Sequence, residues 1–143
     1  MNMRDEDGKR VARKIRLARE NMELIRELTP GEPPEHPDRT TKLAVYKAFQ
    51  EVVDACMELA SAVTGRPGGS SEDDYANIEL LRGEDLITET TEGALKEAVL
   101  LSNLIIHEYD SLSDREAFRG IMRLMESLRE YLERVGRRVG WST

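Results

Sequence analysis

The sequence has one cysteine and two histidines among its 143 residues. A single thiol, Cys56, excludes an intrachain disulfide, and so few histidines disfavour a zinc site. No apolar run approaches the roughly 18 residues that a membrane span needs. We therefore expect a cytoplasmic protein without a membrane segment or a metal site. Its length favours one domain over residues 1–143, with tails at about 1–4 and 137–143.

Three sequence signatures are also missing. The chain has no internal repeat, no glycine-rich phosphate loop and no nucleophile elbow. Proline is concentrated, because four of the five prolines lie between Pro30 and Asp38. Such a segment lacks backbone donors and cannot be helical, so we predict a stiff connector there. A second loop is predicted at GRPGGSS, from Gly65 to Ser71.

The charge is unevenly distributed along a chain whose net charge is −7. Six basic residues and no acid lie between Lys9 and Arg19, and Arg134, Arg137 and Arg138 form a smaller group. A basic helix on an acidic protein can still bind a nucleic acid locally, because phosphates respond to the patch. A charge run on a surface helix is more often a solvated face. Both interpretations stay open at this point.

Apolar residues recur near the 3.6-residue period of an α-helix through most of the chain. They predict four long helices, over about 5–28, from 38 or 40 to 63, from 88–91 to 110, and over 113–135. One or two further helical turns are predicted within 75–87. No strand alternation interrupts this pattern, so the fold class is all-α. We expect an up-and-down antiparallel four-helix bundle with a short extra helix.

The segment Lys96–Asp110, KEAVLLSNLIIHEYD, places polar side chains on an otherwise apolar helix. Asn103 and His107 are four residues apart and share a face. Two apolar rows flank them: Ala94, Ala98, Leu101 and Ile105, and Leu95, Val99 and Ile106. The polar pair should therefore lie at the edge of the core, where the histidine is either a hydrogen-bonded structural residue or a functional one. Likewise, the stripe Gln50, Asp54 and Glu58 either faces water or lines the same cleft as His107.

Three segments together resemble the HepT family of HEPN-domain proteins over roughly Thr41 to Val135. They are LAVYKAFQEVVDACMELA, YANIELLRGEDLIT and, above all, SNLIIHEYDSLSD. Members of that family read Arg-Asn, three apolar residues, His, any residue and Tyr, followed by an acidic turn. Asn103, His107, Tyr109 and Asp110 occupy those positions. Ser102 stands where the family has its arginine.

The resemblance implies the toxin half of a type VII toxin–antitoxin pair. Such toxins are homodimers that cut RNA without a metal or other cofactor, and their partner is a minimal nucleotidyltransferase antitoxin. In this chain His107 would move the proton of the ribose 2′-hydroxyl, with Asn103 beside it. Tyr109 would be the residue to which the antitoxin attaches AMP, which silences the toxin.

Ser102 departs from the family pattern at the position that stabilises charge on phosphorus. A neutral hydroxyl cannot replace the planar, charged fork of arginine, and losing such a group commonly costs on the order of 100- to 1,000-fold in rate. Lys96 lies about 16 Å from His107 along the helix, too far to substitute. Arg82, Arg115 or an arginine across a dimer interface could do so. Alternatives are a catalytically degenerate, substrate-binding partner of the nucleotidyltransferase, or a structural helical dimer.

Overall fold

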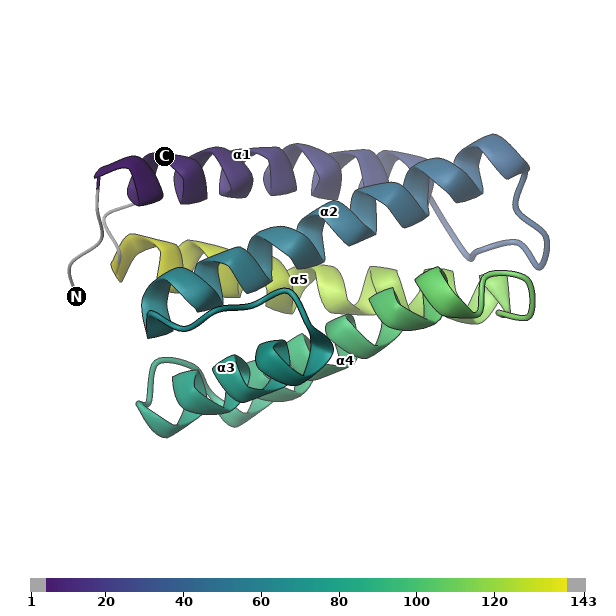
Figure 1. Cartoon of the computed structure of the whole chain (residues 1–143). Coiled ribbons are helices and arrows are strands. Elements are labelled where there is room, and N and C mark those ends of the chain that lie inside the picture. Colours follow the sequence, from purple (N-terminus) through teal and green to yellow (C-terminus); the bar gives the residue numbers. More distant parts are fainter. Residues whose placement is uncertain (1–4, 139–143) are drawn as a thin grey trace.

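The computed structural model describes residues 5–138, and within that range the chain forms five helices and no strand. They are α1 (Asp5–Leu28), α2 (Arg39–Thr64), α3 (Ser71–Gly83), α4 (Glu89–His107) and α5 (Asp114–Arg138). Figure 1 shows α1, α2, α4 and α5 running up and down beside one another, with the short α3 along α4. The predicted antiparallel four-helix bundle with a short extra helix is confirmed.

The start of α2 shows why its predicted boundary is accurate. The carboxylate of Asp38 accepts a hydrogen bond from the Thr41 backbone N–H at 3.1 Å and caps the helix. At the other end Gly65 adopts a left-handed conformation, with φ of 71°, and its N–H donates to the Ser61 carbonyl. Glycine adopts this conformation without steric cost, so α2 ends there.

Helix α3 is longer than the one or two turns predicted within 75–87. It has 13 residues and begins at Ser71. The Ser70 hydroxyl accepts from the Asp73 N–H at 3.1 Å, and three acidic residues, Glu72, Asp73 and Asp74, occupy the first turn. Acids there complement the positive end of the helix dipole. The prediction overlooked this cap because its signal lies inside the glycine-rich loop.

Helix α4 ends at His107 and not at Asp110 as predicted. The backbone N–H groups of Ser111 and Leu112 both donate to the Glu108 carbonyl, at 3.1 and 2.9 Å. These bonds close a tight turn that carries Tyr109 and leads directly into α5. The end of α5 also differs, because residues 137 and 138 of the predicted tail are helical. Residues 1–4 and 139–143 lie outside the described residues.

The core lies between the inner faces of the long helices, and α2 supplies more buried side chains than any other described helix. The largest fully buried side chains include Ile15, Phe49, Leu59, Ile78, Leu95, Phe118, Leu128 and Tyr131. One predicted core residue is wrong, since Ile106 is 57% exposed. Within the described range no helix is long and apolar enough to cross a membrane.

Candidate functional site

Asn103 and His107 lie on one side of α4, but their surroundings differ. His107 is the last residue of α4 and is exposed to solvent. Asn103, one turn earlier, is half-buried, and its Nδ2 donates to the Ser71 hydroxyl at 2.6 Å. The amide is therefore fixed by the start of α3, whereas the imidazole is free to meet another molecule.

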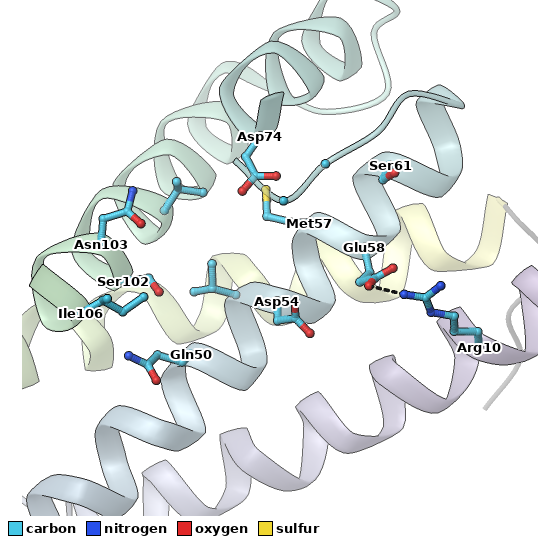
Figure 2. A pocket seen from close by; sticks show the side chains of 14 residues that line it. Arg10, Gln50, Asp54, Met57, Glu58, Ser61, Asp74, Ser102, Asn103 and Ile106 are labelled. Atoms are coloured by element: carbon cyan, nitrogen blue, oxygen red, sulfur yellow. Dashed lines mark hydrogen bonds and ion pairs between the residues drawn. The ribbon is translucent and has the colours of Figure 1, made fainter. Parts of the chain in front are cut away.

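A groove with a volume of about 510 Å³ lies beside Asn103, lined by residues from α2, α4 and the start of α3. Figure 2 shows Asn103 and Ser102 on one side of this groove, facing Gln50 and Asp54 of α2. The stripe Gln50, Asp54 and Glu58 lines this groove, but His107 is not among the lining residues. The alternative in which the stripe and His107 share a cleft is therefore wrong.

The groove is acidic. Glu58 pairs with Arg10 at 2.7 Å and Asp54 pairs with Lys14, so two cations of α1 are committed to α2. The hydrogen bond with Asp54 raises the pKa of Lys14. Asp74 has an oxygen, Oδ1, that is buried with no hydrogen-bond partner among the described residues, and burial raises the pKa of this carboxyl group. Carboxylates disfavour a phosphate backbone, so the groove is unsuited to RNA.

Ser102 belongs to this groove and not to the surface around His107. Its side chain is 9% exposed and faces α2. Ser102 precedes His107 by five positions, and this offset rotates the two side chains roughly 140° apart around the helix axis. Ser102 therefore lines the groove, while His107 lies on another side of α4 and is exposed.

The cations proposed as substitutes within one chain are held elsewhere. Arg82 pairs with Glu92 at 3.9 Å. Glu92 precedes His107 by fifteen residues of the same helix, which is roughly 22 Å. Lys96 pairs with Glu79 at 3.2 Å. Arg115 donates from Nε to the Pro33 carbonyl at 3.3 Å, which ties it to the α1–α2 connector. The arginine across a dimer interface is the candidate that these contacts leave open.

Tyr109 lies in a cluster that the sequence reasoning missed. Its ring is half-buried and packs edge-on against Tyr46, with centroids 6.1 Å apart, and the Lys42 ammonium lies 4.4 Å from its centroid. Asp114 accepts a hydrogen bond from the Tyr46 hydroxyl at 2.5 Å and pairs with Lys42 at 3.2 Å. The four-residue spacing of Lys42 and Tyr46 on α2 was the local signal for this cluster.

The outer face of α4 is unusually apolar around His107. Leu100 and Leu104 are 53% and 37% exposed and share a face with His107, while the exposed Ile106 flanks it. These side chains form an exposed apolar face on α4, next to His107.

The chain is similar in sequence to a family of ribonuclease-like proteins. A family model described as "Ribonuclease HepT-like" matches residues 18–135. The chain is 35% identical to a Methanocaldococcus jannaschii protein called a putative RNase, over 57% of this chain and 93% of that protein. It is 26% identical to an Archaeoglobus fulgidus protein of the same description, over 71% of this chain and 80% of that protein.

Two solved structures share the fold. One is the tri-AMPylated HEPN toxin of Shewanella oneidensis in complex with its MNT antitoxin, with a TM-score of 0.75 and 20% identity over 92% of this chain and 96% of that chain. The other is a toxin–antitoxin complex with AMP-PNP, with a TM-score of 0.77 and 20% identity over 93% and 99%.

Proposed function

The chain belongs to the HepT-like ribonuclease family, and from this premise we propose that it is a metal-independent RNA endonuclease, the toxin of a toxin–antitoxin pair. Its nucleotidyltransferase antitoxin silences it by attaching AMP to Tyr109. The observation that carries the proposal is the placement of the two residues. His107 is exposed at the end of α4, and Tyr109 follows in the adjoining turn. A nucleotide on Tyr109 would add bulk and negative charge beside the imidazole.

His107 supplies the proton transfer in this proposal. Imidazole is the side chain best suited to accept and return protons near neutral pH. It takes the proton of a ribose 2′-hydroxyl, and the 2′-oxygen bonds to the adjacent phosphorus. The bond from that phosphorus to the 5′-oxygen breaks, and the 5′-oxygen leaves with the electron pair and takes a proton from the imidazolium or from water, which gives a 2′,3′-cyclic phosphate. A negatively charged phosphate next to His107 would repel the RNA backbone, which explains how modification of Tyr109 would silence the reaction.

A second copy of the chain completes the site. The exposed face of Leu100 and Leu104 is next to His107, so a copy that covers it would bring two imidazoles together. Arginines of that copy could then supply the positive charge that position 102 does not. RNA is the substrate and the nucleotidyltransferase is the partner of this homodimer.

One observation favours a second function, that of a substrate-binding partner of the nucleotidyltransferase without RNase activity. The family arginine is replaced by Ser102, whose side chain is turned toward the acidic groove. In this case nucleotide would still be transferred to Tyr109, because that residue does not depend on position 102. A structural dimer would show neither activity.

The nuclease is tested by incubating mixed RNA with the purified protein in the presence of a chelator. We expect cleavage by the parent, loss of at least 100-fold in His107→Ala, and full activity in His36→Ala, whose histidine is exposed in the α1–α2 connector. Activity that persists in His107→Ala would reject the assignment. An inactive parent that gains activity in Ser102→Arg would establish the substrate-binding alternative.

The modification is tested separately with a nucleoside triphosphate labelled at the α-phosphate and the antitoxin that co-purifies with the chain. Label should enter the parent and Tyr75→Phe, whose tyrosine is half-buried on α3, but not Tyr109→Phe. Label on Tyr109→Phe equal to that on the parent would place the acceptor elsewhere.

A further inference from the structure

The contacts around Tyr109 form a chain of four side chains that extends from the core to the turn. We propose that Lys42, held by Asp114, positions Tyr109 as the nucleotide acceptor and pairs with the phosphate once it is attached. This inference rests on the proposed modification of Tyr109. It assigns a role to two residues, Lys42 and Asp114, that the motif of α4 does not contain.

The ammonium group of Lys42 is held in one place by two neighbours. Lys42 Nζ lies 4.4 Å from the centre of the Tyr109 ring and 3.2 Å from Asp114 Oδ2. Its side chain is only 20% exposed and that of Asp114 only 16%. A surface lysine usually samples many rotamers, but this one is confined between a carboxylate and an aromatic face. The ammonium is thus fixed against the Tyr109 ring, whose phenol group is also among the groups that raise the pKa of Lys42.

The carboxylate of Asp114 is held in turn by the hydroxyl of Tyr46. Asp114 Oδ1 accepts a hydrogen bond of 2.5 Å from the Tyr46 hydroxyl, and Asp114 is the first residue of α5. Tyr46 is 3% exposed and packs edge-on against Phe118, with centroids 5.7 Å apart. Burial and the bond to Asp114 raise the pKa of Tyr46, so its hydroxyl remains a donor.

Lys42 keeps its positive charge in this cluster. Burial lowers the pKa of Lys42, but Asp114 and Tyr109 outweigh burial and raise it. The amine therefore stays protonated and cannot act as the base for Tyr109. Its contribution is a permanent positive charge beside the phenol oxygen, which stabilises negative charge as it develops there.

The transfer itself uses the nucleoside triphosphate that the nucleotidyltransferase supplies. The Tyr109 oxygen forms a bond to the α-phosphorus, the bond from that phosphorus to the bridging oxygen breaks, and pyrophosphate leaves with the electron pair. The phenol proton passes to water. The product is a phosphodiester with one negative charge, which the Lys42 ammonium is placed to neutralise.

The experiment measures the rate at which label from the α-phosphate enters Tyr109 in the complex with its nucleotidyltransferase. We expect Lys42→Met to lower kcat for this transfer by about 10- to 100-fold with little change in KM for the nucleotide. Lys42→Arg should restore most of the rate because it retains the charge. Lys47→Met is the matched control. Lys47 lies on the same helix as Lys42 but pairs with Glu51, at 3.1 Å, and not with Asp114.

Equal rates for the parent and Lys42→Met would overturn the inference while leaving the modification of Tyr109 intact. A parent that takes no label would overturn both. Should Lys42→Met fail to fold, Asp114→Asn replaces it, because asparagine can still accept from Tyr46 but no longer holds the ammonium by charge. Transfer by folded Asp114→Asn at the parent rate would then count against the proposal, and slower transfer would support it.

Discussion

At the scale of single residues, two tyrosines connect α2 to α5 through their hydroxyl groups. Tyr46 donates from α2 to Asp114. Tyr131 donates in the opposite direction, from α5 to the Cys56 carbonyl of α2 at 2.9 Å. Tyr131 is 2% exposed, so its hydroxyl would be costly to bury without this partner. Each tyrosine therefore fixes the register of α5 against α2 at one point along the bundle.

Removing the Tyr131 hydroxyl should destabilise the fold modestly. We expect Tyr131→Phe to lower the free energy of unfolding by about 1 kcal/mol, because one buried hydrogen bond is lost while the ring still fills its site. Urea denaturation at neutral pH measures the difference. Tyr75→Phe, at a half-buried position on α3, should stay within about 0.5 kcal/mol of the parent. A Tyr131→Phe variant as stable as the parent would contradict the assigned bond.

The same residue predicts a loss of stability at alkaline pH. Burial raises the pKa of Tyr131 well above its ordinary value of 10.0. The unfolded chain therefore releases this proton first, and stability that is complete below pH 10 falls as the pH rises. We expect about 1.4 kcal/mol per pH unit above 10 from this group. Melting temperatures measured from pH 8 to 11 should fall less steeply for Tyr131→Phe than for the parent.

At the scale of helices, the ends of α4 decide where the site residues lie. The start is capped by Thr88, whose hydroxyl accepts from the Thr91 N–H at 3.2 Å. The end comes at His107, and in the turn that follows the Tyr109 ring packs against Tyr46 of α2.

Loss of the Thr88 cap should weaken α4 measurably. We expect Thr88→Ala to cost about 1 kcal/mol of unfolding free energy, because one of the first backbone N–H groups loses its acceptor. The control is Thr90→Ala, at an exposed position within the first turn, which should be neutral or slightly stabilising. Chemical denaturation of both variants measures the contrast, and equal stabilities would show that the cap contributes nothing.

Several basic residues of α1 form ion pairs with other helices. Arg10 and Lys14 pair with acids of α2, and Arg19 pairs with Glu133 of α5 at 3.0 Å. Much of the positive charge is therefore used between helices. Lys9, Arg13 and Arg16 are exposed, so the positive charge that remains lies on the outer face of this helix.

At the scale of the whole molecule, the exposed apolar face of α4 predicts self-association. We expect the parent to be a dimer in light scattering and Leu104→Glu to be a monomer, because a buried carboxylate across the interface would lack a partner. RNA cleavage should fall with the dimer if His107 acts in a shared site. Leu24→Glu, at a leucine of α1 that is 36% exposed, should leave the dimer intact. A parent that is monomeric at micromolar concentration would refute this surface.

The amino-acid sequence is sufficient to predict the four long helices, the bounds of α1 and α2 and the starts of α4 and α5. Periodic apolar residues and capping side chains act within a few positions of each other, so they can be recognised locally. On this basis the sequence predicts the bounds of α1 and α2 within about two residues. Helical spacing pairs Asn103 with His107, whereas Tyr109 is indicated only by the resemblance to the HepT family.

Only the tertiary structure decided what surrounds those residues. Tyr46 and Asp114 are 68 positions apart, and they meet because α2 and α5 pack in one particular register. The same packing turned Ser102 into the acidic groove. It also left Ile106 exposed, although helical spacing alone placed that residue in an apolar row. Contacts between helices depend on how whole faces fit together, and no local pattern carries that information.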